Sequence, residues 1–130
     1  MQQPDSNKDR YFLELAIAEA YKGMEAGDGG PFGCVIVKDN EVLVAGHNRV
    51  LCTNDPTAHA EVVAIREACA LLNDFQLTGC VVYASCEPCP MCMGAIYWAR
   101  PERVVFASSK KDAAEAGFDD SFIYEEISIA

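Results

Sequence analysis

The stretch SCEPCPMCMG, residues 85–94, most constrains how this chain can fold. The mostly apolar run CVVYAS, residues 80–85, predicts a buried central strand. Pro90 then begins a run that predicts a helix, because proline is favoured at a first helical position, where its missing N–H group costs nothing. One junction between a strand and a helix therefore holds three cysteines: Cys86, Cys89 and Cys92.

The rest of the chain alternates between helical and extended patterns. Ser6 or Asn7 can cap a first helix, in which five apolar residues share one face: Leu13, Ala16, Ile17, Ala20 and Met24. The predicted order is helix 7–26, a hairpin of strands 34–37 and 42–48, a loop to Pro56, helix 58–72, strand 80–85, helix 90–100 and strand 103–108. This order predicts one α/β sheet with helices on both faces. After it, a short helix, a loop, and a last strand or helix are left open.

The size and composition of the chain predict one domain, residues 1–130, with a core that needs no disulfide framework. Four of the seven cysteines are predicted to be small buried side chains: Cys34, Cys52, Cys69 and Cys80. The first ten residues lack the apolar core of a signal peptide, and no apolar run is long enough to span a membrane. We therefore expect a cytoplasmic protein, in which clustered cysteines more often bind metal than form disulfides.

The net charge is −10, from 20 acidic and 10 basic residues. A surface of this sign repels phosphate backbones, which weighs against an extended footprint on tRNA or DNA. We expect neither nucleic acid nor membrane among the partners, and a small, roughly neutral substrate.

Three interpretations of the cysteine cluster compete. A zinc ribbon would need a second, separate Cys-x-x-Cys pair, which the sequence lacks. An iron–sulfur cluster usually needs four thiolates, and this cluster supplies three. In the third interpretation, all three thiols are ordinary core or loop residues.

The predicted helix start at Pro90 distinguishes the thiols. Cys89 falls at the helix cap and Cys92 in the first turn, so both sulfurs can face one point at the helix N-terminus. The helix dipole and free N–H groups there stabilise thiolates, which are the ligating form. Cys86 lies at the end of the strand and is expected to point elsewhere.

A catalytic zinc ion takes three protein ligands and keeps a position for water. His47 lies among apolar neighbours in a predicted strand and is expected to be structural. His59 lies at a helix start with Glu61 two residues later, and such a pair can share a site only at a helix end. We predict that His59, Cys89 and Cys92 bind one Zn²⁺.

Glu61 is predicted to take a proton from the zinc-activated water and return it to a leaving amine. The alternative is an ordinary acidic residue in a first helical turn, where the helix dipole favours it. The combination of His-x-Glu with Pro-Cys-x-x-Cys favours the catalytic role.

His59-Ala60-Glu61 followed by Pro88-Cys89-Pro90-Met91-Cys92 resembles the H-x-E…P-C-x-x-C signature of the zinc nucleoside and nucleobase deaminases, in the cytidine/deoxycytidylate deaminase superfamily. Longer blocks resemble bacterial-type guanine deaminases: GGPFGCVIV (29–37), NDPTAHAEVVAIREAC (54–69), SCEPCPMCMGAIYWARP (85–101) and DAAEAGFDDSFIY (112–124).

The resemblance implies a cytidine-deaminase-like three-layer α/β/α sandwich that hydrolyses guanine to xanthine and ammonia. It implies that Phe32 and Trp98 pack on the purine, that Asn48 hydrogen-bonds its edge, that Ala60 offers its backbone and that Asp120 accepts from purine N–H groups. Members of the family are dimers, some of which exchange their C-terminal segments.

The residues themselves agree with a guanine substrate, because guanine carries N–H donors that suit a buried carboxylate acceptor. Of Asp119 and Asp120, only one is expected to point inward, and a solvated acidic turn is the alternative for both. The family pattern continues beyond the position of Ala130 with a tail that closes the pocket and supplies an aromatic residue. This tail is either truncated from the sequence or naturally absent.

Rival functions remain open at this point. Within the same superfamily, the substrate could be guanosine, an adenine-type base, cytosine or a tRNA adenosine, although the charge argues against tRNA. In a different class, the chain would be a structural zinc module that binds a partner and catalyses nothing.

Overall fold

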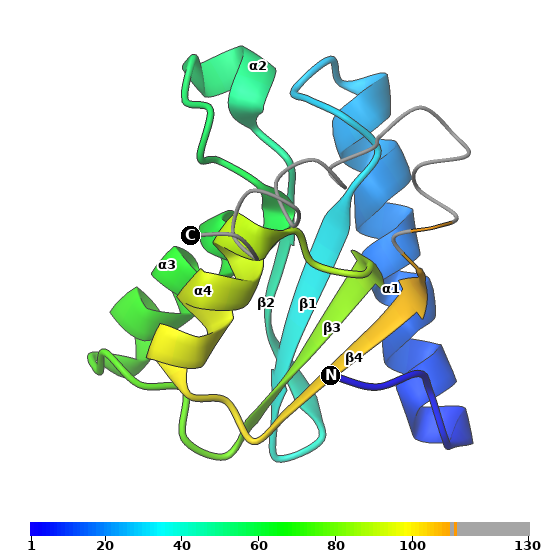
Figure 1. The fold of residues 1–130 in the computed structure, drawn as a ribbon, viewed down its shortest axis with the longest axis vertical. Coiled ribbons are helices and arrows are strands. Elements are labelled where there is room, and N and C mark those ends of the chain that lie inside the picture. Colours follow the sequence, from blue (N-terminus) through cyan, green and yellow to red (C-terminus); the bar gives the residue numbers. More distant parts are fainter. Residues whose placement is uncertain (110, 112–130) are drawn as a thin grey trace, which may run out of the picture.

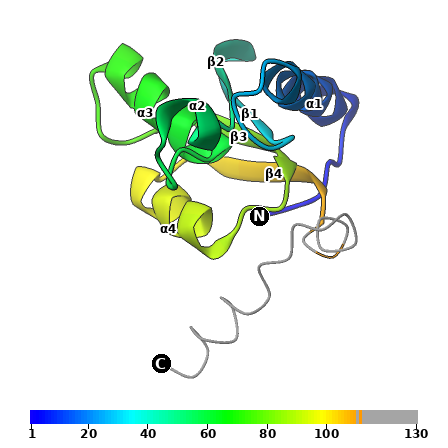
Figure 2. The same ribbon diagram turned by 90° about the horizontal axis from the view of Figure 1, so that it is seen from above.

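The computed structural model describes residues 1–109 and 111, and they form three layers (Figures 1 and 2). Helix α1 (Asn7–Glu25) covers one face of a central sheet. Helices α3 (Ala60–Leu72) and α4 (Pro90–Ala99) lie side by side on the other face. The predicted α/β/α sandwich with helices on both faces is confirmed.

The sheet contains four strands within this described part of the chain, in the order β2-β1-β3-β4. Strands β1 (Gly33–Lys38) and β2 (Glu41–His47) form the predicted antiparallel hairpin. Strand β3 (Cys80–Cys86) is antiparallel to β1 and parallel to β4 (Arg103–Ser108), so the sheet is mixed. Helix α4 makes the crossover that a parallel pair requires.

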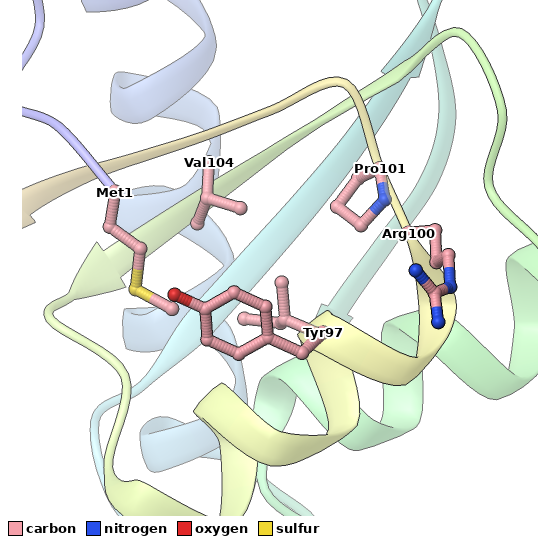
Figure 3. Close-up of a pocket in the computed structure, with 6 residues that line it drawn as sticks. Met1, Tyr97, Arg100, Pro101 and Val104 are labelled. Atoms are coloured by element: carbon pink, nitrogen blue, oxygen red, sulfur yellow. The ribbon is translucent and has the colours of Figure 1, made fainter.

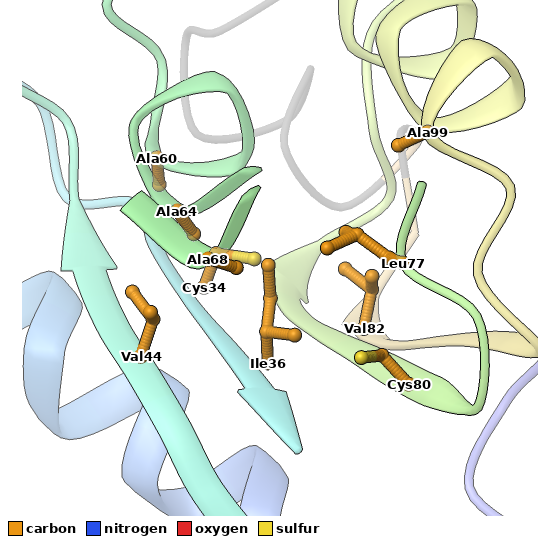
Figure 4. Packing of buried hydrophobic residues seen from close by; sticks show 10 residues of the cluster. All are labelled: Cys34, Ile36, Val44, Ala60, Ala64, Ala68, Leu77, Cys80, Val82 and Ala99. Atoms are coloured by element: carbon orange, nitrogen blue, oxygen red, sulfur yellow. The ribbon is translucent and has the colours of Figure 1, made fainter. Parts of the chain in front are cut away.

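Strand β1 supplies side chains to both cores, because successive residues of a strand point to opposite faces. Val35 and Val37 pack toward α1. The core on this face also contains Phe12, Leu13 and Ala16 of α1, Tyr83 of β3 and Val105 of β4. On the opposite face, the core below α3 and α4 contains Cys34, Ile36, Val44, Ala60, Ala64, Ala68, Leu77, Cys80, Val82 and Ala99 (Figure 4). Burial on both faces explains why the sequence of this strand is a continuous apolar run.

Helix α1 begins and ends near the predicted residues. The Ser6 hydroxyl accepts a hydrogen bond from the Asp9 N–H group at 3.1 Å, and the chain leaves the helix through Gly27 with a φ of 76°. Ile17 and Met24, expected on the same helix face as Leu13, Ala16 and Ala20, are 37% and 43% exposed and do not share their burial. Each follows a buried residue by one position, and one position turns a side chain about 100° around the helix.

The loop expected before Pro56 contains a one-turn helix, α2 (Val50–Thr53), that the sequence pattern did not predict. The Thr53 hydroxyl donates to the Arg49 carbonyl at 2.7 Å, which supports this turn locally. Cys52 lies on α2 and is exposed, so its predicted burial is wrong. Helix α2 contains no buried residue, so the apolar sequence around Cys52 does not indicate burial.

Of the other predicted buried cysteines, Cys34 and Cys80 are buried and Cys69 is partly exposed. The elements expected after residue 109 lie outside the described residues, apart from Lys111. Each helix in the described part is too short or too polar to cross a lipid bilayer.

A buried carboxylate joins α1 to the far edge of the sheet. Asp9 is 1% exposed, accepts from the Tyr83 hydroxyl at 2.8 Å and forms two hydrogen bonds with the Arg103 guanidinium, at 2.9 and 3.3 Å. Burial alone would raise the pKa of Asp9, but the hydrogen bonds from Arg103 and Tyr83 together outweigh it and hold the pKa well below its usual range. Burial and the Asp9 carboxylate raise the pKa of Tyr83 to about 12.

We expect Asp9→Asn to lower the free energy of unfolding at pH 7 by roughly 1.5–3 kcal/mol, the range for hydrogen bonds to charged groups. A carboxyl whose pKa is depressed in the folded state stabilises above its unfolded pKa, here 3.8, and loses that contribution as pH falls below it. Urea titrations at pH 7, 4 and 3 should therefore show a smaller acid loss for Asp9→Asn than for the parent.

The matched control is Asp5→Asn, which removes an exposed carboxylate 3.6 Å from the same guanidinium. An exposed ion pair contributes about 0–1 kcal/mol, so this variant should remain close to the parent. Equal effects of the two substitutions would contradict the role given to Asp9.

Candidate active site

Two helix N-termini meet at the end of the sheet where β3 stops. His59 is the N-cap residue of α3, and Cys89 is the N-cap residue of α4. Neither side chain makes a capping hydrogen bond to its own helix. Pro90 occupies the first turn of α4, as predicted, and Cys92 follows within that turn.

The ligand atoms of His59, Cys89 and Cys92 all lie within 4.8 Å of one another. The Nδ1 atom of His59 is 3.6 Å from the Cys89 sulfur and 3.5 Å from the Cys92 sulfur. A sulfur at 2.3 Å and a nitrogen at 2.0–2.1 Å from one tetrahedral zinc ion would lie roughly 3.5–3.6 Å apart. The spacing and the donor set therefore fit zinc, and the fit identifies Nδ1 as the ligating nitrogen.

The two ligand thiols have opposite pKa shifts. The hydrogen bond from the Cys92 thiol and the nearby His59 ring outweigh burial and lower the pKa of Cys89 to about 4. The same hydrogen bond, then burial and the negative charge of Glu61, raise the pKa of Cys92. The shifts are opposite because the Cys92 thiol donates to the Cys89 sulfur, and a bound cation would favour the thiolate form of both residues, which is the ligating form.

Glu61 lies in the first turn of α3 and is 7% exposed. Burial raises the pKa of its carboxyl, although a hydrogen bond with the Cys92 thiol partly opposes this. The contact with Cys92 places the carboxylate beside the metal ligands, as expected for two residues that meet only at a helix end. A buried carboxyl with a raised pKa is suited to accept and return a proton.

Asn48 follows β2 directly and is 8% exposed. Its Oδ1 atom accepts a hydrogen bond from the Val50 N–H group at 3.0 Å, which leaves the amide NH₂ as the donor that can face a ligand. The Asn48 backbone N–H donates to the Phe32 carbonyl at 3.1 Å, and the N–H of Arg49 donates to the Ala58 carbonyl at 2.9 Å. These bonds join the segments of Phe32 and Asn48 to the residue before His59.

The remaining predicted site residues have different positions. Ala60 is fully buried between His59 and Glu61 at the start of α3. Trp98 lies near the C-terminal end of α4 and is 80% exposed, so the described residues do not bring it to the metal ligands. Asp120 and its neighbour Asp119 lie outside the described residues.

Cys86 is not part of the group formed by His59, Cys89 and Cys92, and its sulfur lies 3.9 Å from the Ser109 carbonyl oxygen. His47 is also no part of the ligand group. Its expected apolar surroundings are wrong, however, because its two ring nitrogens contact the carboxylates of Glu19 and Asp28. Glu19 and Asp28 lie 28 and 19 positions from His47 in the sequence, so no local pattern could predict these contacts.

A pocket of about 280 Å³ lies at the other end of α4, lined by Met1, Ile96, Tyr97, Arg100, Pro101 and Val104 (Figure 3). Val104 belongs to the first part of β4, which runs parallel to β3, whereas the ligands follow the end of β3. The pocket is therefore distinct from the site of the metal ligands.

A cytidine-deaminase-like sandwich that presents zinc ligands from two helix N-termini defines a zinc-dependent deaminase. Residues 6–108 match the model of the cytidine and deoxycytidylate deaminase zinc-binding region, and the chain belongs to this family.

Individual proteins of known sequence and structure are also similar to this chain. The guanine deaminase of Bacillus subtilis (strain 168) is 62% identical over 116 residues, which are 89% of this chain and 74% of that protein. A crystal structure of guanine deaminase from Bacillus subtilis superposes with a TM-score of 0.89 at 61% identity, covering 91% of this chain and 75% of the other. A tRNA-specific adenosine deaminase of Aquifex aeolicus (strain VF5) is 46% identical over 101 residues, 78% of this chain and 66% of that protein.

We expect Cys89→Ser and Cys92→Ser to lose zinc, whereas Cys86→Ser should retain about one zinc ion per chain. The reason is that only Cys89 and Cys92 place sulfur at ligand spacing from His59. Elemental analysis after gel filtration in metal-free buffer measures the content directly. Full zinc in Cys92→Ser, or none in a folded Cys86→Ser, would reverse this assignment of the thiols.

Proposed function

We propose that this chain is a guanine deaminase, which hydrolyses guanine to xanthine and ammonia. The observation that carries the proposal is the 62% identity to the guanine deaminase of Bacillus subtilis, over a span that contains both helix N-termini of the site. The tRNA-specific adenosine deaminase from Aquifex aeolicus is less similar, at 46%. The net charge of −10 also favours a small base over a polyanion.

His59, Cys89 and Cys92 hold the zinc ion in this proposal. When bound through three protein ligands, Zn²⁺ activates water as a nucleophile at neutral pH. Glu61 takes the proton that the attacking water loses and donates it to the amino group that leaves as ammonia. Its burial in the first turn of α3, beside Cys92, supports both transfers, because a raised pKa lets one carboxyl accept and return a proton.

The purine is bound by residues around this centre. The Asn48 amide, fixed by Val50, donates to an acceptor on the purine edge, and the backbone of Ala60 offers a further hydrogen bond. Phe32 packs on the ring from the segment paired with Asn48. Trp98 also packs on the ring in the family pattern, and its 80% exposure requires further covering in the working enzyme.

Asp120 accepts from the N–H donors of guanine, which distinguish it from adenine. Adenine presents a bare N1 acceptor at the matching edge and would leave the carboxylate unpaired. An unpaired buried polar group costs roughly 1–3 kcal/mol, and more when it is charged.

The proposal also covers the location, the oligomeric state and the partners of the protein. In this proposal the enzyme is a single-domain cytoplasmic protein that works as a homodimer, and neither nucleic acid nor membrane is a partner. The exposed Trp98 and Tyr97 on α4 are the kind of aromatic surface that a second subunit covers. An exchanged C-terminal segment would add residues of one subunit to the site of the other.

A panel of guanine, guanosine, adenine, cytosine and cytidine tests the substrate. We expect ammonia release and the ultraviolet spectral change of xanthine formation with guanine, and at least 100-fold lower kcat/KM with the other four, because site donors and acceptors left unpaired reject analogues by large factors. A substrate tRNA belongs in the same panel, since deamination of a tRNA adenosine in preference to guanine would contradict the proposal.

We expect Glu61→Gln to keep its zinc and its fold but to lower kcat with guanine by at least about 10²–10⁴-fold, the usual contribution of a general acid or base. Glutamine has nearly the same shape but cannot accept the proton. Glu67→Gln, an exposed position on the same helix, is the matched control and should retain parental kcat. Near-parental turnover in Glu61→Gln would rule out the proton transfer assigned to Glu61.

A further inference from the structure

His47 is held between two carboxylates immediately before Asn48. Its Nδ1 atom is 3.0 Å from Glu19 Oε2 on α1, and its Nε2 atom is 2.7 Å from Asp28 Oδ2 in the turn after α1. A neutral imidazole has one donor and one acceptor nitrogen, so one carboxylate would then face a lone pair. Only the imidazolium form donates to both acids.

The His47 imidazole ring packs closely against α1 at Gly23. A Cβ atom at Gly23 would lie 2.4 Å from His47 Cδ2, so only glycine lets the imidazole pack this closely against the helix. Three further groups act on the two acids. Lys22 lies 3.8 Å from Glu19, and the Arg49 charge and the Cys52 thiol both interact with Asp28.

The electrostatics agree with the charged form. Burial alone would lower the pKa of His47, but hydrogen bonds to Glu19 and Asp28 and their negative charges together raise it. The hydrogen bond from His47, larger than any opposing effect, lowers the pKa of Asp28. Both partners are thus shifted toward the ionised state that the geometry requires.

Asp28 connects this ion pair to the segment of Asn48. Its backbone carbonyl accepts from the N–H groups of Leu51 and Cys52 at 3.0 and 3.1 Å. The next residue, Gly29, lies directly against Asn48, since a Cβ atom there would come 2.1 Å from Asn48 Oδ1. A displacement of the Asp28 side chain therefore moves a turn that packs against the Asn48 amide.

We propose that His47 is a positioning residue: as an imidazolium ion between Glu19 and Asp28, it holds the Asp28–Gly29 turn and thereby the Asn48 amide that binds the purine. This inference rests on the proposed function for its effect on guanine, but the coupling of His47 to Asn48 is a property of the protein alone. A histidine that is favoured in its charged form donates to both Glu19 and Asp28 at pH values below its pKa. It loses one of these two hydrogen bonds as pH rises through that value.

The protein-only test is an NMR pH titration of the zinc-loaded enzyme. The sequence has two histidines, and His59 is the proposed zinc ligand, so His47 is the expected titrating ring. We expect it to titrate above the ordinary value of 6.5, and the side-chain amide signals of Asn48 to follow the same midpoint. Glu19→Gln should lower both midpoints together.

The matched control is Glu14→Gln, which removes an equal charge from an exposed position on the same helix. It should leave both midpoints unchanged. If Glu19→Gln unfolds the chain, Asp28→Asn removes the other carboxylate and should lower the midpoints in the same way. Two results would overturn the inference: a His47 ring that is neutral at pH 6.5, or Asn48 side-chain amide signals that do not change as His47 titrates.

Kinetics then measure the consequence for binding. We expect the KM for guanine to rise about three- to tenfold as His47 loses its proton, the effect of one displaced hydrogen bond, with a smaller change in kcat. Glu19→Gln should move this rise to lower pH, and ionisation of guanine itself is the same for every variant. An unmoved KM profile despite a lowered His47 midpoint would overturn the positioning role, whereas a parent inactive on guanine but with coupled NMR midpoints would contradict only the proposed function.

Discussion

The meeting of two helix N-termini at one partly buried point is the constraint on which the rest of the site depends. His59 and Cys89 are both N-cap residues, and neither makes a capping hydrogen bond to its own helix. Two thiols and the Glu61 carboxyl then share a small volume of low exposure, where several negative charges cannot be tolerated without a cation. Burial raises the pKa of Glu61, with a smaller contribution from the negative charge of Cys89, and the negative charge of Glu61 in turn contributes to the raised pKa of Cys92.

The sheet produces this meeting through its connections. Strand β3 is interior, and the chain passes from its end directly into α4 and back to β4 in parallel, which fixes where α4 begins. Helix α3 packs on the same face through small side chains, Ala60, Ala64 and Ala68, all fully buried. Such small residues allow close approach of helix and sheet, so that His59 reaches the two sulfurs. On the opposite face, Asp9 ties α1 to β3 and β4 through Tyr83 and Arg103.

Charge is used differently on the two sides of the site. At the metal ligands, the two thiols of Cys89 and Cys92 and the Glu61 carboxyl lie close together, a donor set that suits a cation. At His47, the imidazole ring lies between the carboxylates of Glu19 and Asp28, and Asp28 precedes Gly29, which packs against Asn48. The first arrangement serves the chemistry of a bound ion, and the second supports a neutral amide that must present its donors in a defined direction.

The sequence by itself determined the elements and the metal ligands, because both depend on local spacing. Proline at a first helical position placed Cys89 and Cys92 on one helix end, apolar runs marked the strands, and a chain with two histidines left few choices for the nitrogen ligand. The sequence also separated Cys86 from the ligand pair. These inferences need only the geometry of one strand or one helix.

Only the tertiary structure decided the rest, because it depends on which distant residues become neighbours. Asp9 lies 74 positions from Tyr83 and 94 from Arg103, and His47 lies 28 from Glu19, so no local pattern could pair them. The choice of Nδ1 on His59, the exposure of Ile17 and Met24, and the short helix α2 likewise follow from packing. A helical pattern restricts a side chain to a face about 100° wide, but the partner surface decides which part of that face is covered.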